Sequence, residues 1–591
     1  MKDFFKYTLA TVAGIVLACI VLFFVGTAIL LNMAASSSSE AKVEPGTVFK
    51  LDLSGMLYDH TTRNSLSVVL GDDFAATGLD DVLASIRKAK DNDRICGIYL
   101  RPETTAGYAS LKEIRDALVD FKQSGKFIVA YADFYTQRMY YLASVADHLL
   151  LNPEGMIEWK GLAARPVFYK DLLKKIGVEM QIFKVGTYKS AVEPYTTTDV
   201  SPANREQLEA YMNSVWGQMT ADIAASRPIT EQALNEAADR MMALRPAEET
   251  VSRCLADTLI YKSDVKAYLK RLVGKDEDDS LPMLDLAEMI NVTRNEPKDK
   301  SGQIIAVYYA EGEIVSEASS LLPLLSGTEP NIQANKVVSD LNKLRDDRDV
   351  KAVVLRVNSP GGVAFSAEQI WHAVEQLKEE KPVIVSMGNY AASGGYYISC
   401  NADVIVAQPT TLTGSIGIYG MFPNIKGLND LLGLHYSVVK THELADFENY
   451  NRPMNQAERA VMQGYIERGY ELFLKRCCDG RGMSRDEMDR IAQGRVWTGS
   501  MAKELGLVDE LGGLDRAIEL AKQMADVEAY TLMSYPVGKG LVEQVSQLLG
   551  TELHARTSNP LTLIRQQMEA WGRADLRESV QAHLPFELNM N

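Results

Sequence analysis

The chain has 591 residues, and 62 lysines and arginines stand against 78 aspartates and glutamates, which gives a formal net charge of −16. A chain of this length, 46% apolar, can bury a large core, which excludes a small scaffold held together by disulfides. It also lacks the basic excess that neutralises nucleic-acid phosphates, so we expect no nucleic-acid partner. The six cysteines show no metal-ligand spacing, and we expect neither a metal nor another cofactor.

An uncharged apolar run lies near the start of the chain, from Tyr7 to Leu31. It is longer than the roughly 20 residues that a helix needs to cross the hydrocarbon core of a membrane. A cleaved signal peptide is the alternative, but its apolar region usually has about 7–15 residues. Lys2 and Lys6 precede the run and Glu40 follows it, so the positive-inside rule places the amino terminus in the cytoplasm. The run predicts an uncleaved, single-pass transmembrane anchor.

Changes in composition divide the rest of the chain. A Ser-rich polar segment after the anchor is typical of a tether, and a second polar break before a β-like run at 304–310 indicates a domain boundary or a linker between repeats. The final stretch loses this pattern, and we assign it no role. We therefore predict an anchor (1–33), a tether (34–46), a first domain (47–292), a linker (293–302), a second domain (303–535) and a tail (536–591).

The two predicted domains repeat one pattern at an offset of 256 residues. Ser110-x-x-Glu113 and Ser366-x-x-Gln369 each have the form of a capping box, and an amphipathic helix follows each of them. Further matches at this offset are Tyr140-Tyr141 with Tyr396-Tyr397, Ala146-Asp147 with Ala402-Asp403, and Pro153 with Pro409.

A short β-like run lies on each side of both helices, at 95–101 and 127–131 in the first copy and at 350–357 and 382–386 in the second. Alternating strands and helices are typical of α/β units with mainly parallel pairing, which place functional groups at the carboxyl ends of strands. The sequence therefore predicts two tandem copies of one α/β domain.

The second copy carries a candidate nucleophile, Ser393, between small residues at a strand-to-helix turn. The backbone N–H of Gly394 and one from the neighbouring Gly361-Gly362 turn would be suited to stabilise an oxyanion. The alternative is that Ser393 caps a helix and the glycines allow close packing. No GxSxG surrounds Ser393, and the chain has no HExxH and no phosphate-binding GxxxxGK[ST].

A nucleophilic serine needs a base, and none of the seven histidines lies in a recognisable motif. The first copy offers Lys189, which follows a β-like stretch at 180–183. A solvated surface lysine is the alternative. At the offset of 256, however, Lys189 falls opposite Ala445, and Ser393 falls opposite Gln137. Each copy thus holds one half of a possible Ser–Lys dyad and lacks the other half.

Six segments together closely resemble the signal peptide peptidase A family, also called protease IV, in the double-length form of Gram-negative bacteria. They are YKSAVEP at 188–194, RVNSPGG at 356–362, ASGGYYIS at 392–399, TGSIG at 413–417, GRVWTG at 494–499 and GLVDELGG at 506–513. The resemblance covers about residues 47–535 and the anchor. It implies two tandem ClpP/crotonase-like domains, on the periplasmic side of the inner membrane.

The same resemblance implies an activity and its residues. The protein would be a peptidase that degrades signal peptides and other extended peptides, without a cofactor and as a homotetramer. Ser393 would be the nucleophile and Lys189 the general base, and Gly394 with the Gly361-Gly362 turn would form the oxyanion hole. Ser415, within TGSIG, would orient the lysine amine. The tail after residue 535 lies outside the resemblance.

Two other functions remain open from the sequence. A crotonase-type acyl-CoA enzyme also presents two backbone N–H groups to an acyl oxygen, but it would explain neither the anchor nor the divided dyad. A membrane scaffold that binds peptides without cleaving them is the second alternative. Retention of both Ser393 and Lys189 argues against it.

Overall fold

A computed structural model describes residues 40–61, 77–293, 301–316, 330–537 and 580–583, together with Tyr7, Thr11, Gly14 and Leu17. Within these ranges, no helix has the length and apolar character to cross a membrane. Apart from those four residues, the predicted anchor lies outside the described part of the chain, as do most of the tether and most of the tail.

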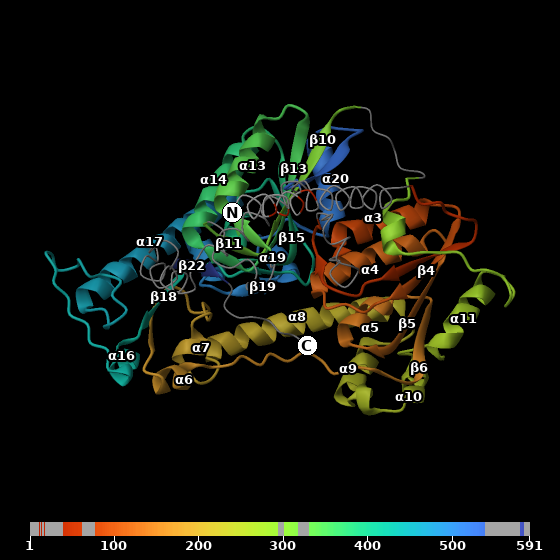
Figure 1. Ribbon diagram of the computed structural model, residues 1–591, viewed down its shortest axis with the longest axis horizontal. Coiled ribbons are helices and arrows are strands. Elements are labelled where there is room, and N and C mark those ends of the chain that lie inside the picture. The colour runs from red at the N-terminus through yellow and green to blue at the C-terminus, as the bar shows by residue number, and fades with distance from the viewer. Residues whose placement is uncertain are drawn as a thin grey trace.

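The first half of the chain forms an all-parallel sheet, whose four longer strands are red and orange in Figure 1. Its strand order is β8-β6-β5-β4-β1-β9. The strands are β8 (Thr258–Leu259), β6 (His148–Ile157), β5 (Phe127–Tyr135), β4 (Ile95–Arg101), β1 (Thr47–Asp52) and β9 (Met283–Leu284). Strand β4 has the predicted bounds, and helix α4 (Tyr108–Lys122) follows it.

The second half builds a corresponding sheet of order β19-β17-β15-β13-β10-β21, with β16 beside β15 and β20 beside β16. The strands are β19 (Val496–Thr498), β17 (Leu412–Gly414), β15 (Val383–Ala392), β13 (Val350–Ser359), β10 (Ile304–Glu311), β21 (Thr531–Tyr535), β16 (Val404–Ala407) and β20 (Glu510–Leu511). All pairs are parallel except β17 with β19. Helix α14 (Ala364–Lys378) matches α4 residue for residue at the offset of 256, which confirms the tandem α/β architecture.

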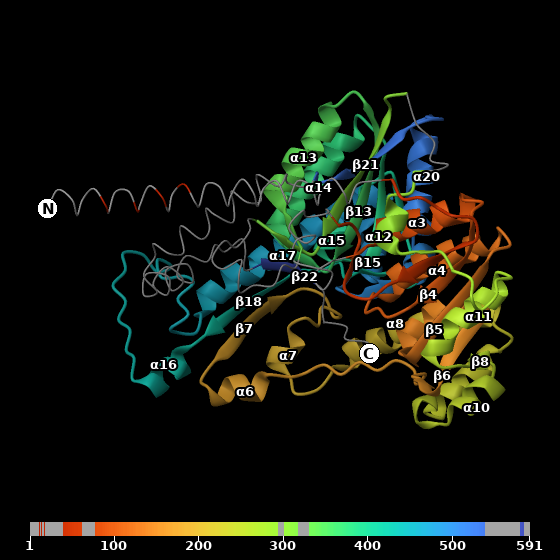
Figure 2. The ribbon, with the colours of Figure 1, turned by 45° about the vertical axis from the view of Figure 1, so that its right-hand side comes forward.

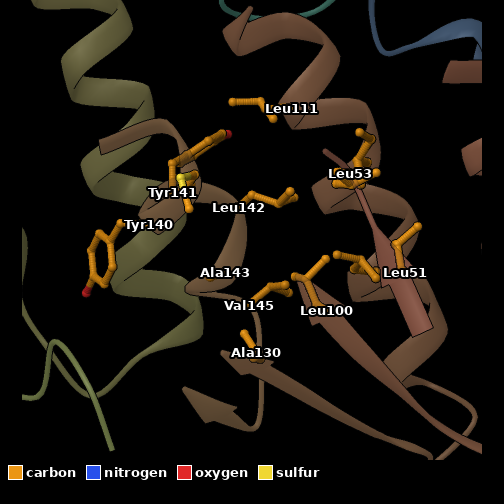
Figure 3. Packing of buried hydrophobic residues seen from close by; sticks show 14 of the residues in the cluster. Leu51, Leu53, Leu100, Leu111, Ala130, Tyr140, Tyr141, Leu142, Ala143 and Val145 are labelled. Carbon is orange, nitrogen blue, oxygen red and sulfur yellow. The ribbon is translucent and has the colours of Figure 1, made fainter. Parts of the chain in front are cut away.

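The helix faces predicted from spacing are buried. On α4 the buried apolar residues include Leu111 and Leu118, and on α14 they include Ile370 and Leu377. Figure 3 shows the first of these cores, where Leu111 lies with Leu51 and Leu53 of the β1 segment and with Leu100 of β4. The same cluster includes Ala392, Leu412 and Val496, so the apolar core of the first half extends into the second.

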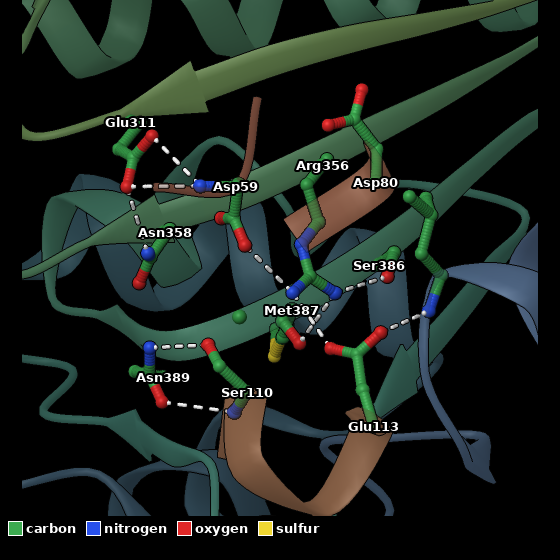
Figure 4. Close-up of polar contacts among 12 residues, drawn as sticks. Asp59, Asp80, Ser110, Glu113, Glu311, Arg356, Asn358, Ser386, Met387 and Asn389 are labelled. Atoms are coloured by element: carbon green, nitrogen blue, oxygen red, sulfur yellow. Dashed lines mark hydrogen bonds and ion pairs between the residues drawn. The ribbon is translucent and has the colours of Figure 1, made fainter. Parts of the chain in front are cut away.

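The predicted capping boxes are wrong. Both helices begin three residues earlier than predicted, and neither amino end has a side-chain cap. Ser110 instead bonds Asn389 of β15: its hydroxyl accepts from Asn389 Nδ2 at 2.7 Å, and its N–H donates to Asn389 Oδ1 at 3.1 Å (Figure 4). Glu113 forms an ion pair with Arg356 of β13 at 2.7 Å. These polar side chains hold the two halves together.

A third sheet joins the two halves, in the order β12-β11-β14-β22-β18-β7. It consists of β12 (Asn331–Gln333), β11 (Glu313–Val315), β14 (Gly361–Val363), β22 (Val580–His583), β18 (Tyr419–Asn424) and β7 (Glu179–Lys184). Strand β7 comes from the first half and pairs antiparallel with β18 of the second. Figure 2 shows β7 lying beside β18, away from the first sheet.

Candidate active site

Ser393 lies directly after β15 and directly before the short helix α15 (Gly394–Tyr397). Its backbone has φ +55° and ψ −114°, a region that residues with a side chain rarely occupy. Such strained conformations persist where the surrounding structure fixes them, and they cluster at functional sites. The side chain makes no capping bond to α15, so the helix-cap interpretation of this serine is wrong.

Lys189 reaches this serine on the loop that follows β7. Antiparallel pairing places Lys184, at the end of β7, opposite Tyr419 of β18. Helix α8 (Pro202–Ser226) supports the loop, because Gln207 Nε2 donates to the Tyr188 carbonyl at 3.1 Å and to Ser190 Oγ at 3.0 Å. A lysine from the first half of the chain therefore lies among residues of the second half.

The structure brings the two predicted dyad residues together. Lys189 Nζ lies 2.8 Å from Ser393 Oγ and 3.0 Å from both the hydroxyl and the carbonyl oxygen of Ser415. All three residues are 0% exposed. Burial holds the pKa of Lys189 well below its ordinary value of 10.5, because removal from water disfavours the ammonium form. A neutral amine at this distance is suited to accept the serine proton.

The predicted oxyanion glycines surround the same point. Gly361 and Gly362 have φ +106° and +151°, and a Cβ on Gly362 would lie 2.1 Å from the Ile314 carbonyl oxygen. A Cβ on Gly394 would come within 3.1 Å of the Gly361 Cα. The two loops thus approach each other as closely as residues without side chains allow. Because Gly394 directly follows Ser393, this proximity brings the Gly361-Gly362 turn close to the nucleophile. The Gly361 N–H donates to Ser359 Oγ at 3.1 Å.

The positions that correspond to the dyad in the opposite copies lack its chemistry. Gln137, opposite Ser393 in the repeat, is buried, and its Oε1 accepts backbone N–H bonds from Lys160 and Gly161. Ala445, opposite Lys189, lies in an exposed turn. Within the described residues, the Ser–Lys pair therefore forms once, between the halves.

Two glycines that the sequence analysis did not single out make room for Lys189. A Cβ on Gly494 would lie 2.7 Å from the Lys189 Cβ, and a Cβ on Gly417 would lie 3.3 Å from the Lys189 Cδ. Both glycines belong to the segments TGSIG and GRVWTG. In the sequence, these two segments indicated only a family resemblance. In the structure, their glycines leave space for the lysine side chain.

Gly494→Ala should disable the site without unfolding the protein. The added methyl group would displace Lys189, and an error of about 1 Å in a catalytic group can lower activity about 100-fold. We expect a loss of that size in kcat/KM for peptide cleavage. Gly482→Ala is the matched control, because Gly482 has a similar φ, +64° against +76°, but no atom near its Cβ position. Equal activity losses in the two variants would contradict the assignment.

Comparison with known proteins decides the family. The model of peptidase family S49 matches residues 120–276 and 375–528, one segment in each half. The chain belongs to peptidase family S49. The Clp protease model also matches residues 324–411, which agrees with the predicted ClpP-like fold of the second domain.

Relatives of similar length support the same assignment. Protease 4 of Salmonella typhi is 33% identical over 610 residues, which cover 100% of this chain and 93% of the relative. Protease 4 of Haemophilus influenzae is 34% identical, and the match covers 85% of this chain and 84% of the relative. The chloroplastic serine protease SPPA of Arabidopsis thaliana is 30% identical, and the match covers 82% of this chain and 70% of the relative. The resemblance to protease IV is confirmed, and the chain is a serine-type peptidase of family S49.

Proposed function

We propose that this protein is a membrane-anchored serine endopeptidase in which Ser393 is the nucleophile and Lys189 the general base. The observation that carries the proposal is the 2.8 Å approach of Lys189 Nζ to Ser393 Oγ at a site where both side chains are inaccessible to water. Within the described part of the chain, no carboxylate lies at hydrogen-bonding distance from Lys189 Nζ, and a buried lysine without such a partner gains little stability from its charge. Its placement beside a strained serine is typical of a base and its nucleophile.

The proposed reaction has two halves. In the first, the neutral amine of Lys189 takes the Ser393 proton as Oγ attacks the peptide carbonyl carbon, and the N–H groups of Gly394 and the Gly361-Gly362 turn stabilise the resulting oxyanion. The lysine then gives that proton to the leaving amine, and an acyl-serine remains. In the second, Lys189 removes a proton from water, whose oxygen attacks the ester, and returns it to Ser393 Oγ as the acid leaves.

Ser415 is the proposed positioning residue for the amine. Its hydroxyl and carbonyl oxygens, both at 3.0 Å, fix two directions around Lys189 Nζ. The remaining direction faces Ser393 Oγ. Since Ser415 itself has φ +51°, the turn that aims both of its oxygens is also strained. This arrangement supports a role in orienting the base.

The proposed substrates are signal peptides and other extended peptides at the inner membrane. Support for the location comes from the uncharged run at 7–31, with lysines before it and acidic residues after it. Catalytic domains on the periplasmic side follow from that orientation. The signal-peptide substrate and the homotetramer rest on the family resemblance. The curated relative from Enterococcus faecium, 33% identical over 199 residues, carries the name putative signal peptide peptidase SppA.

Two assays separate this function from a crotonase-type enzyme and from a peptide-binding scaffold. Full-length protein in lipid vesicles should cleave a synthetic signal peptide and should be labelled by a serine-directed acylating probe. Ser393→Ala should abolish both signals. Labelling without peptide cleavage, together with turnover of an acyl-CoA, would favour the crotonase type. Absence of labelling and cleavage would favour the scaffold.

The pH dependence of activity should report the lowered pKa of Lys189. Because the neutral amine is the active form, kcat/KM should be low in acid, rise with pH and level off well below pH 10.5. The measurement is a pH–rate profile with a soluble peptide substrate, with protein integrity checked by circular dichroism at each pH. A profile that keeps rising up to about pH 10.5, as a solvated lysine would give, would contradict a buried neutral base.

A further inference from the structure

Helix α8 comes from the first half of the chain but lies beside β19 of the second half (Figure 1). Two of its side chains bond residues of the second half. Ser214 Oγ lies 2.9 Å from Thr498 Oγ1, and the Tyr211 hydroxyl donates to the Thr410 carbonyl at 3.4 Å. These bonds fix the helix against the strand. Gln207 lies one turn before Tyr211, on the same face of the helix.

The side chain of Gln207 bonds both neighbours of Lys189 and the strand β19. Its Nε2 donates to the Tyr188 carbonyl at 3.1 Å and to Ser190 Oγ at 3.0 Å. Its Oε1 accepts from the Val496 N–H at 3.2 Å. Gln207 is 1% exposed, so these partners replace the water that a solvated amide would bind. One side chain thus connects the loop that carries the proposed base to a strand of the second half.

Strand β19 in turn supports the turn that bonds the lysine amine. It pairs antiparallel with β17. Ser415, the residue after β17, donates its N–H to the carbonyl of Arg495, the residue before β19, at 2.7 Å. The hydroxyl and carbonyl oxygens of Ser415 are the ones that bond Lys189 Nζ. Gln207 therefore connects the backbone around Lys189 to the strand that supports the two acceptors of its amine.

The polar groups around Gln207 are bonded to one another. The Ser190 hydroxyl donates to Asn204 Oδ1 at 3.0 Å, and Asn204 Nδ2 donates to Glu193 Oε2 at 2.9 Å. All three side chains belong to buried residues. Loss of the Gln207 amide would leave buried backbone groups without their partner, and the cost of such groups favours a shift of the loop. The position of the loop should therefore depend on this amide.

We propose that Gln207 is a second positioning residue, which sets the Lys189 amine between Ser415 and Ser393. The inference rests on the proposed function, because it takes Lys189 as the general base. A displacement of about 1 Å in a catalytic group can lower activity about 100-fold. Since a displaced base slows proton transfer but leaves the contacts with the peptide in place, the loss should fall on kcat and KM should stay the same.

The kinetics of Gln207→Met test this role, because methionine keeps the length of the side chain and removes its amide. We expect kcat to fall at least about tenfold. The acid limb of the pH–rate profile should move to higher pH, because a displaced Lys189 regains water and its pKa rises toward 10.5. A residue that only stabilises the fold would leave the limb in place, and an unchanged limb would contradict the proposal.

The matched control is Gln137→Met. Gln137 is also a buried amide, and its Oε1 accepts from two backbone N–H groups of a neighbouring loop. This variant should keep the wild-type kcat and pH profile. Circular dichroism checks that each variant folds. If Gln207→Met does not fold, Ser190→Ala takes its place, because it removes one acceptor of the same amide and should move the acid limb in the same direction.

Chemical labelling tests the position of Lys189 without catalysis. The probe is acetic anhydride, the proteins are full-length Ser393→Ala with and without Gln207→Met, and mass spectrometry compares Lys189 with the exposed Lys174. Lys189 should react more slowly than Lys174 in Ser393→Ala. Gln207→Met should raise the Lys189 rate several-fold, and Gln137→Met should not.

Equal Lys189 labelling with and without Gln207→Met would overturn the proposal even if the enzyme is active. Absence of peptide cleavage by the unmodified protein, with the labelling difference retained, would instead count against the proposed function alone.

Discussion

Ser393→Ala and Lys189→Met should each lower kcat for peptide cleavage by about 10⁴-fold or more, the loss seen when an activated nucleophile or its base is removed. The physical reason is that Nζ and Oγ, 2.8 Å apart, act as one unit. The double variant should therefore be no less active than either single variant. Kinetics with a soluble peptide at a pH on the plateau of the wild-type profile measure all three.

The control for these variants is Lys174→Met, at an exposed position on α6 (Lys170–Lys175). Helix α6 directly precedes β7, the strand that leads to Lys189. The substitution thus removes a nearby lysine that does not contact the site, and the variant should keep full activity. Methionine at position 189 lacks only the terminal atom of the unbranched lysine side chain and fills most of the same buried space. Substantial activity in Lys189→Met, or losses that add in the double variant, would contradict a shared proton-transfer step.

Local patterns predicted the repeated units well. The runs at 95–101 and 350–357 became β4 and β13, and the apolar faces of α4 and α14 are buried as their spacing indicated. Such elements depend on periodicities of two or 3.6 residues, which a sequence displays directly. The dyad was predicted by a different route, namely the contrast between copies and the family resemblance. Neither route gave the geometry.

Contacts between distant segments could not be predicted in this way. Spacing made Ser110 and Glu113 look like a capping box, but both side chains bond residues of the second half instead. Strand β7 looked like a strand of the first domain, yet its partner is β18. Gly494 is needed because another segment carries Lys189 past it. In each case the deciding partner lies far away in the sequence, so no local pattern encodes it.

Strain and burial at the site have a common explanation. Ser393 and Ser415 both have positive φ, and the fully buried lysine between them lowers stability at neutral pH, because folding there releases the proton that the unfolded state holds. These unfavourable features are held in place by the surrounding sheets and by the contacts between halves. A buried contact that joins the two halves should therefore affect activity as well as stability, because the dyad forms between the halves.

That contact is centred on Arg356, which lies within β13 and is the first residue of the RVNSPGG segment. Its guanidinium donates to Asp59 at 2.8 Å, to Glu113 at 2.7 Å and to Ser386 at 2.9 Å (Figure 4). Asp59 and Glu113 belong to the first half, and their side chains are 2% exposed. Burial raises the pKa of Glu113 above its ordinary value, and Arg356 opposes that shift.

Arg356→Met should destabilise the protein by about 3–5 kcal/mol, because two buried carboxylates would lose their cationic partner. The pKa of Glu113 would rise further in the folded state, so folding would take up protons and the loss of stability should grow as pH increases. Adding Asp59→Asn and Glu113→Gln removes both charges and should recover most of the loss. Urea unfolding at pH 6 and pH 8 measures both effects.

The control is Arg485→Met. It breaks an ion pair whose side chains are 52% and 53% exposed and should lower the free energy of unfolding by less than about 1 kcal/mol. If the triple variant is no more stable than Arg356→Met, the buried charges are not what joins the halves.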